Sequence, residues 1–387
     1  MMNTNDKQPT FAILGCILGT AVGDALGLPF EGLSRRRMTR FSSTDLSRHR
    51  FLFGRGMVSD DTDHTCLVGL ALLESNSESE LFARRLAIHL RRWLMAVPAG
   101  VGLATLRACL RLCAGFGPKR SGVLSAGNGP AMRSALLGVC AGHDTNRLVA
   151  LVRESTRITH TDPKAEIGAL AVAVAAYVAS TSPSVDGTVL QATLNAAFAH
   201  AELPATTVAE FSELVNQAIA SANDGDSTAK FSERFGRKGA SGYMYHTAPA
   251  VLQTWLRHPE DFRAGVIEVI TAGGDTDTTA AILGALIGAR VGSAGIPPEW
   301  LTGLWEWPRS VAWMTALAEQ LARMSYDEPH AVTGDTDSAG LAGTQLRTPG
   351  CPVAPKLRTA VWQLPIRNAV FTTAVIWHGL VRLIGGI

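Results

Sequence analysis

The sequence predicts an all-α protein, and three observations support this fold class. Hydrophobic residues make up 47% of the 387 residues but aromatic residues only 6%, a balance that favours packed helices over β-sandwiches or barrels. Apolar residues recur at helical spacing between polar, glycine or proline breaks. The sequence has no hairpin signal and no alternation of strands with helices. We therefore expect a compact, all-helical fold.

The first predicted helix, Phe11–Gly27, has a glycine at every fourth position from Gly15 onward, and the later helix Thr276–Val291 repeats this pattern. The spacing places the glycines on one helical face, where two backbones can pack closely inside a core. The other predicted helices are, in chain order, Thr62–Glu74, Glu80–Ala96, Gly102–Cys113, Pro130–Cys140, Asn146–Arg157, Lys164–Ala179, Asp186–His200, Val208–Asn223, Thr247–Leu256, Pro259–Ile270, Ser310–Met324 and Arg367–Leu383.

Three polar stretches interrupt these helices. Ser34–Arg50 is rich in arginine, Ser221–Gly242 mixes polar residues with glycine, and Tyr326–Lys356 is predicted to be a mobile loop. The composition does not shift enough to separate two domains, so we expect one domain over residues 1–387. The last apolar run carries His378 and Arg382, and we predict a docked core helix over residues 367–383 instead of a membrane span.

Charge and cysteine content bound the class of protein. The 35 Lys and Arg residues nearly balance 33 Asp and Glu residues, so we expect no nucleic acid and no membrane as partner, and a monomer. Six cysteines lie in apolar runs without a CxxC pair, which is typical of buried, reduced thiols in a cytoplasmic protein. Cys109 and Cys113 lie one turn apart, but no second Cys/His pair completes a zinc site.

Two aspartate-rich loops each precede a predicted helix. The first reads GMVSDDTDH over residues 56–64, and the second reads AGGDTDTT over residues 272–279. Capping of a helix N-terminus explains one such loop, but capping requires a single acceptor. Several carboxylates packed together raise one another's pKa values or require cations. Carboxylate and hydroxyl oxygens suit Mg²⁺ or Mn²⁺ better than zinc, and a pair of ions about 3.5–4 Å apart could share them if the two helices pack together.

Together with the segment GCILGTAVGDALG over residues 15–27, these loops resemble the ADP-ribosylglycohydrolase family, and the resemblance extends to Arg367 and Asn368. The resemblance implies a compact, orthogonal bundle of helices that holds two Mg²⁺ or Mn²⁺ ions in a cleft for ADP-ribose. The metal ligands that it implies are Ser59, Asp60, Asp61, Asp275, Asp277 and Thr278. Glu31 matches the family's flap glutamate, so the implied catalytic residues are Glu31 and Asp61.

Further matches concern the ligand. The implied ADP-ribose-binding residues are Ser125, Gly127, Asn128, Gly129, His160, Tyr243 and Gly274. Taken without the resemblance, several of these residues have simpler explanations: the glycine-rich segment is as typical of a turn, a single histidine is more often structural, and a tyrosine beside a glycine more often anchors a loop. Glu31 in a loop after a proline is likewise more often only solvated.

The implied function is a metal-dependent hydrolase that removes ADP-ribose from modified protein side chains, with ADP-ribosyl-arginine as the favoured substrate. The alternative is a catalytically inactive relative that binds ADP-ribose or has a crystallin-like structural role. Gly100 stands where some members carry a proposed proton-shuttling aspartate. This departure leaves Glu31 or a metal-bound water to transfer the proton.

Overall fold

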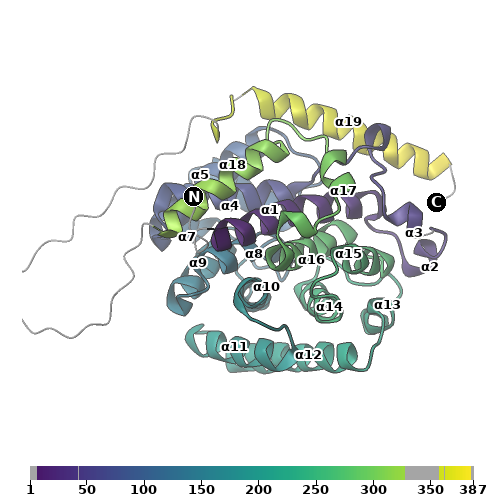
Figure 1. Ribbon diagram of the computed structural model, residues 1–387. Coiled ribbons are helices and arrows are strands. Elements are labelled where there is room, and N and C mark those ends of the chain that lie inside the picture. Colours follow the sequence, from purple (N-terminus) through teal and green to yellow (C-terminus); the bar gives the residue numbers. More distant parts are fainter. Residues whose placement is uncertain (1–6, 42, 327–356, 361, 385–387) are drawn as a thin grey trace, which may run out of the picture.

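The computed structural model describes residues 7–41, 43–326, 357–360 and 362–384, and within them it is helical, with isolated β-bridges in place of strands (Figure 1). The helices are α1 (Lys7–Gly27), η2 (Leu28–Phe30), α2 (Arg35–Met38), α3 (Ser43–Leu46), η3 (Leu52–Gly54), α4 (Asp60–Ser75), α5 (Ser79–Met95), α6 (Leu103–Cys113), α7 (Pro118–Ser121), η4 (Ala131–Arg133), α8 (Ala135–Ala141), α9 (Thr145–Arg157), α10 (Pro163–Thr181), α11 (Gly187–His200), α12 (Ala205–Asn223), α13 (Thr228–Phe231), η5 (Ser232–Phe235), α14 (Met244–Arg257), α15 (Phe262–Thr271), α16 (Thr276–Val291), η6 (Ser293–Gly295), α17 (Pro298–Gly303), α18 (Val311–Tyr326) and α19 (Gln363–Ile384). The predicted all-α class is confirmed.

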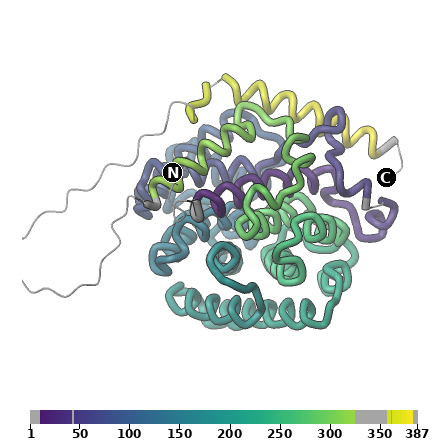
Figure 2. Tube along the Cα trace, viewed as in Figure 1, coloured from purple at the N-terminus to yellow at the C-terminus, as the bar shows by residue number. Residues whose placement is uncertain are grey.

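The centre of the molecule is the pair α1 and α16, which lie antiparallel in backbone contact (Figures 1 and 2). A Cβ atom added to Gly15 would lie 1.9 Å from the carbonyl oxygen of Gly288, and one added to Gly23 would lie 2.0 Å from that of Ala280. Neither separation leaves room for a side chain. The glycine spacing is therefore a packing device, as the sequence predicts.

This antiparallel packing brings the C-terminal end of α1 to the N-terminal end of α16. Thr276, the first residue of α16, donates a hydrogen bond from its hydroxyl to the carbonyl of Gly27 at 2.9 Å. The segment after α1, which contains Glu31, consequently starts beside the second acidic loop. Gly27 and Thr276, which are 249 positions apart in the chain, thus lie side by side.

Around this pair, buried side chains of α4, α5, α8, α10, α14 and α18 join those of α1 and α16 in one continuous apolar cluster. Two helical stretches, Thr10–Phe30 and α10, are long and apolar enough to cross a membrane, but 89% and 78% of them are buried inside the fold. Such burial is what the central helices of a large core require. Helices α11 and α12 lie at the edge of this bundle (Figure 2).

The structure corrects some predicted helix limits. The predicted helix Pro130–Cys140 is divided into η4 and α8, because the chain tightens to a 3-10 turn where the wholly buried side chain of Arg133 bonds to Ser155. The helix predicted from Pro259 begins only at Phe262, because the Asp261 side chain caps it by accepting from Ala264 N.

Other predictions need correction or fall outside the described residues. The arginine-rich stretch, predicted as a loop, includes the short helices α2 and α3. Four of the six cysteines are buried, whereas Cys113 is exposed, so it does not belong with the predicted buried thiols. Cys351 and the loop predicted over 326–356 lie outside the described residues, apart from the last residue of α18.

The C-terminal helix is not the core helix that its apolar composition predicts. Helix α19 lies across the outside of the bundle (Figure 1) and packs through Phe371 and Ala374 against Leu28, Phe51 and Met57 in a small separate cluster. Its other face is exposed and apolar, with Ile366, Val370, Ile376, Trp377 and Leu380 at the surface. The prediction failed because hydrophobic content does not distinguish a buried helix from one that is covered on one side only.

Candidate metal and ligand site

The first acidic loop is held rigidly at the start of α4 by an aspartate of α1. The buried carboxylate of Asp24 accepts hydrogen bonds from the backbone amides of Ser59 at 2.9 and 3.0 Å and of Thr62 at 3.2 Å, and from the Thr62 hydroxyl at 2.6 Å. These are the free amides that a helix N-terminus always presents. The hydroxyl of Ser59, the N-cap residue of α4, accepts from the amide of Asp61 at 3.3 Å. Because Asp24 and Ser59 together satisfy these amides, the carboxylates of Asp60 and Asp61 are not needed for capping.

The second acidic loop is shaped by backbone contacts. Gly273 and Gly274 have φ angles of +72° and +93°, which favour glycine. A Cβ atom on Gly274 would lie 2.0 Å from the carbonyl oxygen of Ala240. The amide of Asp275 donates to that carbonyl at 2.8 Å, and Gly274 exchanges backbone hydrogen bonds with Gly32 and Leu33 at 2.8 and 2.9 Å. Gly274 therefore shapes the loop through its backbone, and its predicted contact with the ligand stays a prediction.

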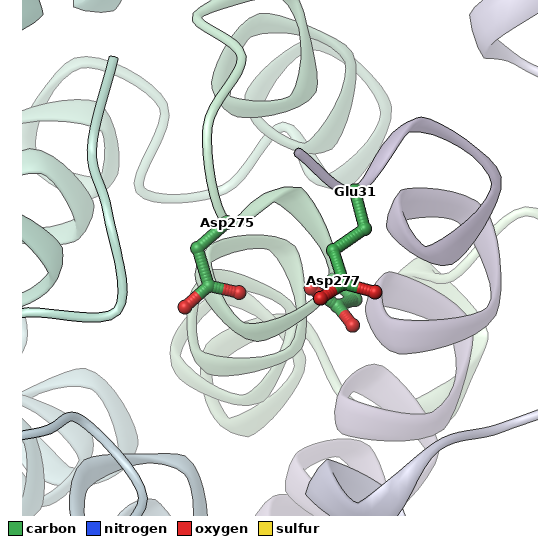
Figure 3. Close-up of side chains that lie close together, drawn as sticks. All are labelled: Glu31, Asp275 and Asp277. Carbon is green, nitrogen blue, oxygen red and sulfur yellow. The ribbon is translucent and has the colours of Figure 1, made fainter. Parts of the chain in front are cut away.

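The two acidic loops meet. The Thr278 hydroxyl, at the start of α16, donates to Asp61 Oδ2 at 3.3 Å, and the Ser59 hydroxyl donates to the same oxygen at 3.0 Å. Carboxylate oxygens of Glu31, Asp275 and Asp277 lie within 4.8 Å of one another. Figure 3 shows this trio, with Glu31 reaching from the segment after α1 toward the two aspartates at the start of α16.

The carboxylates of the site repel one another in a dry environment. Burial, followed by the charge of Asp24, raises the pKa of Asp60 to about 8, and burial raises the pKa of Asp24 itself to about 7. The pKa values of Asp61 and Asp277 also lie well above the usual aspartate range, again mainly because of burial. Such shifts mean that the protein alone does not neutralise this negative charge.

The donor set fits a divalent cation. Asp61 Oδ1 and Asp277 Oδ1 are buried and have no hydrogen-bond partner, and each belongs to a different loop. Buried polar atoms without a partner are rare unless something else binds them. The surrounding donors are carboxylate and hydroxyl oxygens, the ligands that Mg²⁺ and Mn²⁺ prefer. Capping therefore does not account for the two loops, and their oxygen atoms form a set that could hold a metal ion.

The predicted ligand loop borders the second acidic loop. The side-chain amide of Asn128 donates to Asp275 Oδ2 at 2.7 Å and to the Thr247 hydroxyl at 3.0 Å, and its backbone amide donates to the carbonyl of Gly242 at 2.9 Å. Gly127 forms a β-bridge with Tyr243. Asn128 is thus tied to the acidic cluster, and Gly127 joins this loop to the loop of Tyr243.

The remaining predicted ligand residues have separate surroundings. His160 is buried beneath the loop, with its ring 3.0 Å from the position of a Cβ on Gly127 and 3.1 Å from one on Gly129. The Ser125 hydroxyl accepts from the amide of Gly127 at 3.2 Å, so it stabilises the loop itself. Tyr243 is half-buried. His160 therefore packs against the backbone of this loop, and Tyr243 lies at the edge of the loop; their contacts with the ligand stay predictions.

Sequence reasoning missed the buried groups behind the first loop. Asp24 appears in the sequence only as an acid within an apolar, glycine-striped helix, and that isolated charge is the signal that could have revealed it. Asp63 has a supporting function, because its carboxylate accepts from Trp93 Nε1 at 3.0 Å and from Arg309 at 2.5 Å. Gly100, at the position of the aspartate found in some relatives, lies in an exposed turn with a φ of +75°.

Comparison with known proteins agrees with this geometry. The model of the ADP-ribosylglycohydrolase family matches residues 6–330. The chain belongs to this family. Residues 331–387, which include α19, lie beyond the match, whereas Glu31, both acidic loops and the loop of Asn128 lie inside it. Family membership supports a hydrolase that removes ADP-ribose.

Individual proteins that are similar in sequence or structure match most of the chain. An uncharacterized protein of Archaeoglobus fulgidus is 31% identical over 75% of this chain and 90% of its own length. The ADP-ribosyl-[dinitrogen reductase] glycohydrolase of Rhodospirillum rubrum is 26% identical over 75% of this chain and 89% of its own. A solved structure described as an ADP-ribosylglycohydrolase-related protein complex superposes with a TM-score of 0.58 at 28% identity, covering 82% of this chain and 99% of that one.

Proposed function

We propose that this ADP-ribosylglycohydrolase is a Mg²⁺- or Mn²⁺-dependent hydrolase that cleaves the C1 glycosidic bond between ADP-ribose and a modified protein side chain, with ADP-ribosyl-arginine as the first substrate to test. One observation carries the proposal: two acidic loops more than 200 residues apart meet at Asp61 and Thr278, beside the carboxylate of Glu31. A catalytically inactive relative with only a structural role would not need the two loops to meet. It would also not need buried carboxylate oxygens without a hydrogen-bond partner.

The residues that would hold two divalent ions are those of the two helix starts. The first loop offers the hydroxyl of Ser59 and the carboxylates of Asp60 and Asp61, and the second offers Asp275, Asp277 and Thr278. Bound ions of this class polarise hydroxyl groups and stabilise negative charge. The protein's own contribution is to keep these oxygens fixed and partly dry, so that the terminal ribose is oriented.

Glu31 is suited to proton transfer. Partial loss of water around the carboxylate, together with the nearby charge of Asp275, raises the pKa of Glu31 above its ordinary value, so its carboxyl group is easier to protonate than one fully in water. In the hydrolysis, the oxygen of a water molecule bonds to C1, the C1–N bond breaks, and the released proton reaches the leaving nitrogen. Glu31 would accept the proton from water and return it to the leaving group.

The neighbouring loops are suited to the rest of the ligand. The loop of Asn128 and the loop of Tyr243 are joined by a β-bridge and by the hydrogen bond from Asn128 N to Gly242. Glycines at 127, 129 and 242 allow backbone amides to approach anionic oxygens. The half-buried ring of Tyr243 supplies an apolar surface on which a base can stack.

The decisive experiment offers the purified protein ADP-ribose linked to arginine, to serine and to an O-acetyl group, with Mg²⁺, Mn²⁺ or EDTA, and measures free ADP-ribose. We expect release from the arginine-linked substrate with metal only. Asp61→Asn and Asp277→Asn should each lower the rate at least about 10³-fold, the scale of losing a transition-state electrostatic group. Asp261→Asn is the matched control, because it makes the same change at the start of α15, where asparagine caps equally well.

Full activity of both site variants would refute the metal assignment. Release from the serine- or O-acetyl-linked substrate alone would keep the hydrolase and replace the arginine preference. Tight binding of ADP-ribose without release from any substrate would overturn the enzymatic proposal in favour of an inactive binding protein.

A further inference from the structure

Helix α19 lies beyond the residues matched by the family, yet it contacts both halves of the site. In Figure 1 it crosses the molecule from the end near α18 to the end near α2 and α3. Its inner face carries Arg367, Phe371, His378 and Arg382, spaced by four, seven and four residues. This spacing puts them along one helical face.

The N-terminal half of α19 is fastened to the first acidic loop. The buried side chain of Arg367 donates to both oxygens of Glu306, at 2.7 and 2.9 Å, and to the carbonyl of Val58 at 2.6 Å. Glu306 in turn accepts from the amide of Val58 at 3.1 Å. Val58 directly precedes Ser59, so this half of α19 is tied to the residue before the first metal-ligand candidate. Asn368 adds a bond to the carbonyl of Ala96 at 2.8 Å.

The C-terminal half of α19 is fastened to the segment of Glu31. The His378 ring Nε2 lies 3.1 Å from the carbonyl oxygen of Pro29, which can only accept, and both terminal nitrogens of Arg382 lie 3.3 Å from the carbonyl oxygen of Glu31. Phe371 stacks with Phe51 at 5.9 Å between ring centroids, and the His378 ring also packs on Phe51, at 5.4 Å. The helix therefore holds the backbone on either side of Phe30.

The Glu31 carboxylate depends on this backbone support. Within the described residues, no side-chain hydrogen bond fixes the carboxylate, and the residue is exposed. The following residue, Gly32, has a φ of +73° and open space around it. Gly32 N is held by Gly274 O at 2.8 Å on the side of the second loop. The contacts from α19 hold the other side of the same short segment.

We propose that α19 is a strap that positions Glu31 over the acidic cluster, with His378 and Arg382 as positioning residues. The inference rests on the proposed function of Glu31 in proton transfer. Arg367 fixes the strap to the first acidic loop, and His378 and Arg382 fix it to the Glu31 segment. The helix therefore sets the distance between the first acidic loop and the Glu31 segment. Loss of the second attachment should slow the chemical step without weakening metal or substrate binding.

The test compares His378→Ala, Arg382→Ala and the double variant with Val381→Ala, a neighbouring change at an exposed side chain. We expect the double variant to lose at least 10-fold in kcat, with KM and Mn²⁺ affinity within twofold of the parent. Hydrogen exchange of the peptide covering residues 28–34 should become at least 10-fold faster. Arg382→Lys keeps a donor for the Glu31 carbonyl and should restore most of both properties, whereas Val381→Ala should change neither.

The exchange measurement separates this proposal from the proposed function, because it requires no turnover. Unchanged exchange in the double variant would overturn the strap whatever the activity. Faster exchange with unchanged kcat would also overturn it, because Glu31 would then not depend on the strap. If the parent releases ADP-ribose from no substrate, the proposed function fails, and the exchange rates alone decide whether α19 holds the segment.

Discussion

The two acidic loops reach the same place by different construction. The first is fixed by side chains: Asp24 caps it from α1, and the buried pair of Asp63 and Arg309 supports it from behind. The second is fixed by the backbone: glycines at positive φ pair with the neighbouring segments of Ala240 and Leu33. The first loop is therefore packed into the core. The second loop instead connects the segment of Glu31, the loop of Asn128 and the loop of Tyr243.

Because the two loops are built differently, we expect mutations near them to have different consequences. Because the first loop is sealed into the core, its geometry depends on buried hydrogen bonds, and loss of the groups that support it, Asp24 or Asp63, should appear mainly as lost stability. The second loop touches the segment of Glu31, the loop of Asn128 and the loop of Tyr243. A mutation that shifts the second loop should therefore also displace these three segments, which carry residues predicted to contact the ligand. Four predictions test this comparison.

The largest effect should come from pH in the metal-free protein, because several buried carboxylates contribute together. The pKa values of Asp24 and Asp60 rise from about 4 when unfolded to about 7 and about 8 when folded, mainly through burial. The folded protein therefore keeps protons that the unfolded chain has released, and unfolding releases them. The free energy of unfolding should consequently fall as the pH rises from about 4 to about 8.

Denaturant unfolding in EDTA at pH 5 and pH 8 measures this slope. Saturating Mg²⁺ or Mn²⁺ should remove it, because the cation takes the place of the protons. Asp60→Asn should flatten the slope in EDTA, whereas the control Asp261→Asn should not. Stability that rises between pH 5 and pH 8 without metal would contradict the assigned direction.

The next effect concerns the support of the first loop. Asp24→Ala leaves the buried amides of Ser59 and Thr62 without an acceptor, and we expect a loss of about 4 kcal/mol in stability with Mg²⁺ present. Asp24→Asn keeps one acceptor oxygen and should cost about half as much. Urea unfolding measures both. Equal stability of the alanine variant and the parent would show that Asp24 does not hold this loop.

For the second loop, we expect alanine substitutions at two glycines to lower the stability by different amounts. Gly274 and Gly32 both have positive φ, but a Cβ on Gly274 would lie 2.0 Å from a backbone oxygen, whereas one on Gly32 would meet nothing within 4 Å. Gly32→Ala should therefore cost about 1 kcal/mol through φ alone. Gly274→Ala should cost about 2 kcal/mol more, because the backbone of the loop must move. Thermal unfolding of the two variants checks this, and similar losses would remove the case for a tightly packed second loop.

The smallest effect belongs to the link between the second loop and the ligand loop. Asn128→Ala removes the hydrogen bonds to Asp275 and Thr247, and we expect a loss of about 1 kcal/mol in stability. If these hydrogen bonds orient the loop of Asn128 toward the ligand, KM for the ADP-ribosylated substrate should rise while Mn²⁺ affinity stays close to the parent. Isothermal titration with Mn²⁺ and steady-state kinetics separate the two. A larger change in Mn²⁺ affinity than in KM would assign Asn128 to the metal site instead.

The long helices were predictable because periodicity, breaks and glycine spacing are local. The helix Thr276–Val291 has the predicted limits, since Asp275 and Gly292 mark its ends in the sequence. Short elements such as α2 were missed because one turn carries too little periodicity. The outside position of α19 was missed because apolar content alone does not show which face is covered.

The site was predictable in part. The two aspartate loops indicated cation ligands from composition alone, and the family resemblance marked Glu31 and Asn128. Asp24, His378 and Arg382 were not identified, because their significance lies in contacts with Ser59, Pro29 and Glu31 that no local pattern contains. The structure adds a packing requirement at Gly274, which has a positive φ and lies close to Ala240, and its contact with the ligand stays a prediction.

The sequence by itself determined the helices, the glycine faces of α1 and α16 and the chemistry of the acidic residues, because these follow from local spacing and side-chain type. Only the tertiary structure decided that the two loops share one site. That outcome depends on the antiparallel contact of α1 with α16, which sets Gly27 beside Thr276, and on the bond from Thr278 to Asp61. Long-range packing chooses among helix arrangements that the same local signals would permit.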